Sequence, residues 1–204
     1  MMLNYTIVKL DELMRTFPDD ENKIREILGC FSCLNNHDVD RFLKEKALVF
    51  DRQGLSKTYL VYTSYQNEMV LVGYFSLANK SFVVRKNAKI SKTLLKRISK
   101  FGHYDAELKQ YMVSSPLIAQ LGKNDEYKGL ISGDVLLTYA CNTVKEAQAL
   151  LGGKIVYLEC EDKLRLLEFY RANGFVEFGK RELEADEKDD MEGKYLIQLL
   201  KYLH

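Results

Sequence analysis

The chain has 204 residues, 47% of them apolar, and a formal net charge of +1 at pH 7. This length and composition fit one globular domain with a sizeable core, and they exclude a disordered or fibrous chain. The near-zero net charge gives no overall attraction to nucleic acid or membranes, and no apolar run reaches the ~20 residues of a membrane helix. The N-terminal residues also lack the basic-then-apolar pattern of a secretion signal, so we expect a cytoplasmic protein without membrane contact.

The four cysteines do not form a recognisable metal or disulfide pattern. Cys30 and Cys33 make a C-x-x-C pair, but Cys141 and Cys160 are far from it and from each other, and the three histidines are scattered. A structural zinc site needs a second pair of ligands at suitable spacing. We therefore expect no metal, and four reduced thiols that are mostly packed.

The first 80 residues combine helical and strand-like patterns. Acids in the first turn, an apolar stripe and Gly29 delimit one helix, and apolar residues at helical spacing define a second. The sequence QNE lies between two β-rich runs and indicates a hairpin. The expected elements are a strand at 5–10, a helix at 18–29, a second helix from about Asn36 to Phe50, and strands at 58–65 and 69–78.

Residues 80–100 contain eight cations and no acid: Lys80, Arg85, Lys86, Lys89, Lys92, Lys96, Arg97 and Lys100. A basic face of this kind can neutralise nucleic-acid phosphates. The interpretation that we favour is a solvated helix or loop that balances the acidic segment 182–192.

The second half reads as strand, glycine-bearing loop, helix, strand, helix and two strands. Pro116 inside the first of these strands implies an edge position or a bulge. Asn173-Gly174 is a good left-handed cap for the last helix. The expected elements are strands at 111–122, 154–160, 175–183 and 194–203, and helices at 132–151 and 162–174. The fold class is therefore α/β with a mixed, twisted central sheet and helices on both faces.

Two stretches carry candidate chemistry. In the loop EYKGLISGD, residues 126–134, unpaired N–H groups at the helix start favour an anion, although an ordinary loop has the same composition. Tyr170 shares a helix face with Leu166 and Leu167, which is typical of a core residue. A buried tyrosine hydroxyl also needs a partner and can donate a proton.

Taken together, these stretches resemble the GNAT acetyltransferase family. EYKGLISGDVLL is similar to its acetyl-CoA loop, LLEFYRANGFVEF to its closing helix and strand, and MVLVGYFSLA to its third strand; the likeness covers roughly residues 35–200. It implies the GNAT fold over a single domain, residues 1–204. It also implies an N-acetyltransferase that moves an acetyl group from acetyl-CoA to a primary amine by direct attack.

The resemblance also implies roles for individual residues. Backbone amides of Leu121, Gly122 and Lys123 would hold the pantetheine and polarise the thioester carbonyl. Tyr170 would protonate the leaving thiolate, and Lys163 would meet a phosphate. Glu159 and His103 are the candidates for the base that accepts the amine proton. The pyrophosphate would bind to the amides of Lys128, Gly129, Leu130, Ile131, Ser132, Gly133 and Asp134.

The loop departs from the family pattern at two positions. Glu126 replaces the usual basic or amide residue, and Ile131 replaces the usual second glycine. These departures motivate an alternative from another class, a catalytically inactive GNAT-like module that binds CoA or a protein.

The acceptor amine is not identified by the sequence and is a small molecule, a protein or an aminoacyl-tRNA. FSCLNNHDVDRFLKEKA resembles the branch of the family that contains aminoacyl-tRNA-acetylating toxins. In that reading the cations of residues 80–100 contact RNA phosphates. A homodimer is compatible with the fold and is left open.

Overall fold

The structure is a computed structural model, and it describes residues 4–185, 187–188 and 193–204. The chain divides into two compact units, each described by itself. Unit 1 comprises Met1–Ala78 and Ala119–Ala140, and unit 2 comprises Asn79–Ile118 and Cys141–His204. Three elements, β3, β5 and α6, run through both units.

The earlier elements are β1 Tyr5–Lys9, α1 Leu10–Thr16, α2 Glu21–Gly29, α3 His37–Arg41, η1 Phe42–Lys46, α4 Ala47–Arg52, β2 Lys57–Tyr65 and β3 Glu68–Arg85. The later elements are α5 Lys92–Ile98, β4 Gly102–Asp105, β5 Gln110–Lys123, η2 Asp125–Tyr127, α6 Gly133–Leu151, β6 Ile155–Glu161, α7 Leu164–Ala172, β7 Val176–Glu182 and β8 Tyr195–Tyr202.

The strands of unit 1 follow the order β1-β2-β3-β5, and the β1–β2 and β2–β3 pairs are antiparallel. The predicted hairpin is confirmed. Its turn residues Gln66 and Asn67 have φ angles of 52° and 66°. Two consecutive positive φ angles are typical of the tight hairpin turn whose twist matches that of the strands.

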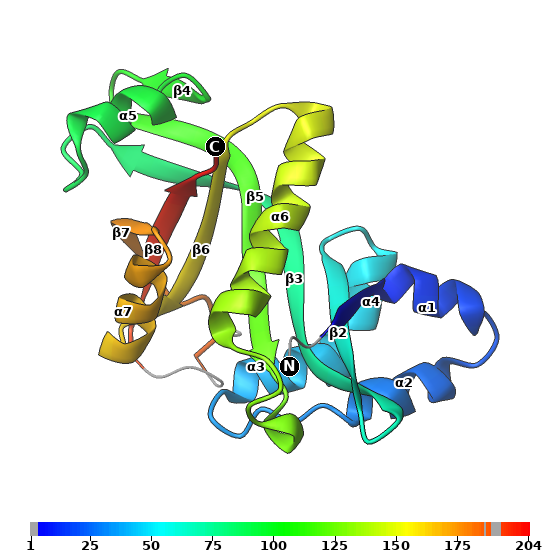
Figure 1. Cartoon of the computed structure of the whole chain (residues 1–204). Coiled ribbons are helices and arrows are strands. Elements are labelled where there is room, and N and C mark those ends of the chain that lie inside the picture. The colour runs from blue at the N-terminus through cyan, green and yellow to red at the C-terminus, as the bar shows by residue number, and fades with distance from the viewer. Residues whose placement is uncertain (1–3, 186, 189–192) are drawn as a thin grey trace. The chain divides into compact units, whose positions relative to one another are not determined.

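Helices cover both faces of the strands in unit 1. Tyr74 of β3 is fully buried against Phe31 and donates a hydrogen bond of 2.6 Å to the Val39 carbonyl. The preceding residue, Gly73, faces Leu136 of α6, because successive residues of a strand point to opposite faces. The helices α1, α2 and α4 lie together beside β2 (Figure 1).

The predicted helix between Asn36 and Phe50 is interrupted. It consists of α3, the π-helical turn η1 and α4. A single π-helical turn adds a residue to the helix without removing its apolar stripe, so the spacing of apolar residues did not reveal it. Phe42, Leu43, Ala47 and Leu48 still enter the buried core of unit 1.

The strands of unit 2 follow the order β3-β5-β6-β8-β7, and β4 pairs with β5. The β5–β6 pairing is parallel, whereas β6–β8 and β7–β8 are antiparallel, so the sheet is mixed as predicted. The edge position expected from Pro116 is wrong, because β5 lies between β3 and β6. Pro116 falls between the residues that pair with β4 and those that pair with β6, where a missing N–H is tolerated.

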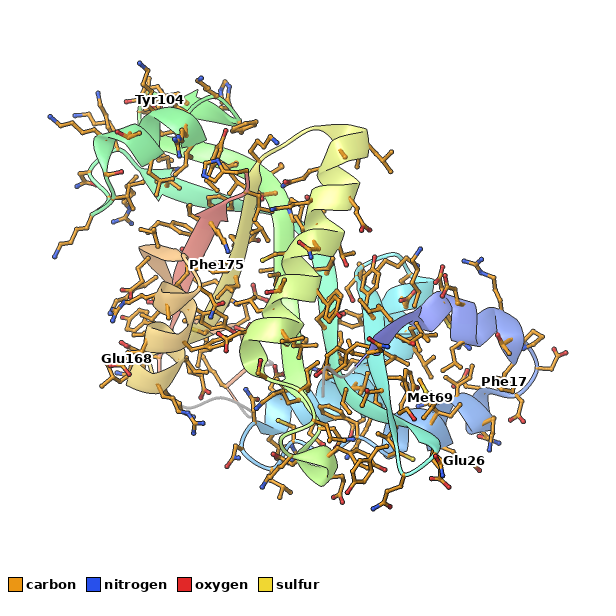
Figure 2. All side chains as sticks on the ribbon, in the orientation of Figure 1. Phe17, Glu26, Met69, Tyr104, Glu168 and Phe175 are labelled. Atoms are coloured by element: carbon orange, nitrogen blue, oxygen red, sulfur yellow. The ribbon has the colours of Figure 1, made fainter. Side chains whose placement is uncertain are left out.

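Helix α7 lies beside β6 in unit 2 (Figure 1). Its end is capped as predicted, since Gly174 has φ +79° and its N–H donates to the Arg171 carbonyl. The reversal places Phe175 on the inner side of α7, whereas Glu168 points away from the strands (Figure 2). No helix in the described part of the chain is long and apolar enough to cross a membrane.

Candidate functional site

Asn124, at the end of β5, anchors the glycine-bearing loop in unit 1. Its side chain is 2% exposed and makes four hydrogen bonds. The amide nitrogen donates to the carbonyls of Cys30 and Leu71, at 3.1 and 2.8 Å. The amide oxygen accepts from the N–H groups of Ser32 and Glu126, both at 3.1 Å. Sequence reasoning missed Asn124, because three of these partners are distant in the chain.

The loop leaves a series of backbone N–H groups open before α6. Within the described residues, the N–H groups of Lys128, Gly129, Ile131, Ser132 and Gly133 have no hydrogen-bond partner. The Ser132 hydroxyl and carbonyl accept from the N–H groups of Val135 and Leu136, at 3.2 Å each, and so cap the helix. Open amides and the positive end of the dipole of a 19-residue helix together favour an anion.

The two departures from the family pattern do not obstruct these amides. The Ile131 side chain is 4% exposed, so it packs into the protein. Glu126 is exposed, which lets its carboxylate remain in water. Gly129 has φ +87° with open space around it, and a side chain there would be strained.

The predicted pantetheine residues lie at the C-terminal end of β5, also in unit 1. Gly122 is required by packing, because a Cβ atom there would lie 2.4 Å from Val39 and 3.0 Å from Phe31. Lys123 is exposed and Leu121 is half-buried. The side chain of Lys128 forms a long ion pair of 3.9 Å with Asp125 and is otherwise exposed.

Tyr170 lies in unit 2, on the inner side of α7. Its ring contacts Phe169 and Phe175, at centroid distances of 5.0 and 5.9 Å, and the residue is 9% exposed. Burial, and secondarily the nearby Cys160, raise its pKa above the ordinary value. Its hydroxyl has no hydrogen-bond partner in the described part of the chain. It is therefore a protonated phenol without an internal acceptor.

Glu159, the predicted base, belongs to a polar network in unit 2. Its carboxylate accepts from Arg181 Nε at 2.5 Å and from Gln198 Nε2 at 2.8 Å. Cys160 follows it in β6, so the Glu159 side chain points to the opposite face of the strand from Cys160 and its neighbour Tyr170. The phenol and the carboxylate therefore lie on opposite faces of β6. In the described part of the chain β5 pairs with β6 only as far as Leu158, so a substrate at the edge of β6 beside Glu159 and Cys160 can reach both faces.

The remaining candidates are Lys163, His103 and the cysteines. Lys163 forms an ion pair of 3.1 Å with Glu161, which reduces the charge that it can offer to a phosphate. His103 is exposed on β4. All four cysteines are free thiols; Cys141 and Cys160 are buried, Cys33 is partly buried and Cys30 is exposed. No group of three or more potential metal ligands occurs among the described residues.

Comparison with solved structures identifies the fold. AtaT in complex with acetyl-methionyl-tRNAfMet is 18% identical, with a TM-score of 0.62, over 95% of this chain and 94% of that chain. The fold is that of the GNAT acetyltransferases. A mutant of KacT is 16% identical, with a TM-score of 0.62, over 95% and 93% of the two chains. AtaTR bound with AcCoA is 16% identical, with a TM-score of 0.55, over 95% and 92%. No family model and no curated protein matches the chain.

The GNAT fold expected from the sequence is thus confirmed, and the similarity extends over nearly the whole chain. The candidate residues fall into two groups. The amides of the loop and of the end of β5 belong to unit 1, whereas Tyr170, Glu159 and Lys163 belong to unit 2. Their roles in binding and catalysis stay predictions.

Proposed function

We propose that the protein is an acetyl-CoA-dependent N-acetyltransferase that transfers the acetyl group to a primary amine. We further propose that both units belong to one GNAT domain, residues 1–204. The expected cytoplasmic location and the homodimer stay predictions.

The open amides of Lys128, Gly129, Ile131, Ser132 and Gly133 carry this proposal. They surround the start of a long helix, and they follow a strand end that is held in place by Asn124. A pyrophosphate offers the several acceptor oxygens that such a group of donors needs. Binding of acetyl-CoA by a similar chain, AtaTR, supports the same conclusion.

The residues of unit 2 provide the chemistry of the transfer. The amine nitrogen forms a bond to the thioester carbonyl carbon, the C–S bond breaks, and the thiolate takes the proton of Tyr170, which regains a proton from solvent. The raised pKa of Tyr170 keeps the phenol protonated at neutral pH. The amine proton leaves to solvent or to Glu159, whose carboxylate already accepts two hydrogen bonds.

Calorimetric titration of acetyl-CoA tests the binding site. We expect micromolar binding to the wild type and binding weaker by about 100-fold or more in Gly133→Asp, because the new carboxylate would lie beside the phosphates. Gly29→Asp is a matched control at an open position of α2, and it should bind like the wild type. If the wild type does not bind millimolar acetyl-CoA, the acetyltransferase proposal is wrong. If it binds but acetylates no amine in a broad panel, the inactive module is favoured.

Aminoacyl-tRNA is a second candidate acceptor, favoured by the basic segment of unit 2. Lys86, Lys89, Lys92, Lys96 and Lys100 form no ion pair within the described residues, and three of them lie on or next to α5. The complex of AtaT with acetyl-methionyl-tRNAfMet shows this type of ligand on a similar chain.

Filter binding to bulk tRNA at several salt concentrations tests this candidate. We expect affinity to fall steeply with salt, and the double variant Lys92→Gln, Lys96→Gln should reduce the slope of log K against log salt by about 1.5. Lys23→Gln, on α2 of unit 1, removes a cation outside the basic segment and serves as the control. Salt-independent binding, or an unchanged slope, would remove the RNA candidate and leave the basic segment as a solvated surface.

A further inference from the structure

Unit 2 contains a pocket on the face of the sheet that bears Glu159. Its volume is about 680 Å³, within the ~300–1,000 Å³ typical of small-molecule sites. The floor consists of three buried rings, with Phe82 lying 4.6 Å from Tyr157 and 4.9 Å from Phe178, between centroids. The charged lining residues are Lys80, Arg85, Glu159, Lys180, Arg181 and Glu184.

Tyr157 presents an unsatisfied polar group to this pocket. The residue is 2% exposed, and its hydroxyl has no hydrogen-bond partner in the part of the chain that the structure describes. Burial, and then the charge of Glu159, raise its pKa, so the hydroxyl is protonated and can both donate and accept. The hydroxyl oxygen itself is not among the buried atoms without a partner, so it is accessible at the pocket and free to bond a ligand.

The pocket offers a negative side chain at one end and positive side chains at the other. Arg181 is occupied, since Nε bonds Glu159 and both terminal nitrogens bond Glu187 at 2.6 Å. The side chains of Lys80 and Arg85 form no hydrogen bond or ion pair with the described residues, although the charge of Lys80 also acts on Glu187. The end with Glu159 and Tyr157 therefore suits a hydrogen-bond donor such as an amine, and Lys80 and Arg85 suit an anion.

We propose that this pocket binds the acceptor, and that the acceptor is a small primary amine whose far end carries a carboxylate or a phosphate. The amine bonds Tyr157 and Glu159, an apolar or planar middle part packs on the three rings, and the anion pairs with Lys80 and Arg85. This inference rests on the proposed acetyltransferase function and specifies its substrate class.

Binding of three related probes, measured by NMR in the absence of acetyl-CoA, tests the inference. The complete probe is 4-(2-aminoethyl)benzoic acid; 2-phenylethylamine lacks the carboxylate, and 4-ethylbenzoic acid lacks the amine. We expect the complete probe to bind about tenfold or more tightly than either fragment, because each lacks one charged contact. Tyramine phosphate carries a phosphate in place of the carboxylate. Comparing its affinity with that of 4-(2-aminoethyl)benzoic acid shows which of the two anions the pocket prefers.

Single substitutions test which residues bind the anionic end and the amine end of the probe. Arg85→Gln should weaken the complete probe about tenfold and leave 2-phenylethylamine unchanged, and Tyr157→Phe should weaken the amine probes and leave 4-ethylbenzoic acid unchanged. Tyr104→Phe, an exposed tyrosine on β4 outside the pocket, is the control (Figure 2).

Two outcomes would overturn the inference: no binding of any probe at millimolar concentration, or equal affinity for all probes and variants. Because acetyl-CoA is absent, this result is independent of the calorimetric test. Failure of acetyl-CoA to bind would overturn the proposed function, whereas failure of the probes alone would overturn only the acceptor class.

Discussion

Replacing Tyr170 by phenylalanine should lower the turnover number by about 100- to 10,000-fold, the usual contribution of a general acid. The substitution removes only the hydroxyl, so the ring contacts with Phe169 and Phe175 remain. Since that hydroxyl has no hydrogen-bond partner in the described chain, its loss should leave the thermal stability nearly unchanged. Turnover is measured by thiol release from acetyl-CoA with an accepted amine, and affinity by calorimetry.

The dissociation constant of acetyl-CoA separates this role from a structural one. A proton donor acts on the departing thiolate, so Tyr170→Phe should bind acetyl-CoA like the wild type. Tyr104→Phe should change neither turnover nor affinity. If Tyr170→Phe keeps wild-type turnover while folded, Tyr170 is a core residue and the thiolate takes its proton from elsewhere.

Much of the fold could be predicted because its signals are local. The strand and helix patterns of the second half, the stop at Gly174 and the hairpin at Gln66 and Asn67 each depend on a few neighbouring residues. Helix α1 was not predicted, since it follows β1 directly and its seven residues are too short for a clear apolar period. Strand β4 has four residues and was missed for the same reason.

The candidate site could be predicted only where its residues are consecutive in the chain. The loop was found from its glycines and the following helix. The pocket floor was not found, because Phe82, Tyr157 and Phe178 come from three different strands and each also fits an ordinary buried position. The role of Asn124 was not predicted for a related reason, since its amide donates hydrogen bonds to the carbonyls of Cys30 and Leu71, which are 94 and 53 residues away.

Asn124→Ala should lower the free energy of unfolding by about 2–4 kcal/mol, because it removes four hydrogen bonds and leaves buried backbone groups without partners. The buried Leu71 carbonyl should account for the largest share, since water reaches the exposed Glu126 more easily. For a protein of this size the melting temperature should fall by roughly 5–15 °C, measured by calorimetry. Asn35→Ala, at an exposed position, should change stability by less than about 0.5 kcal/mol.

The same substitution should also weaken acetyl-CoA binding below the melting transition. Asn124 ties the end of β5 to Ser32 and to Glu126, so its loss frees the start of the loop whose amides are proposed to hold the pyrophosphate. Ordering that loop again on binding costs free energy, and we expect affinity to fall about tenfold. Unchanged stability would show that the hydrogen bonds of Asn124 are replaced by water. Reduced stability with unchanged affinity would show that the loop amides are positioned without Asn124, through the helix cap at Ser132.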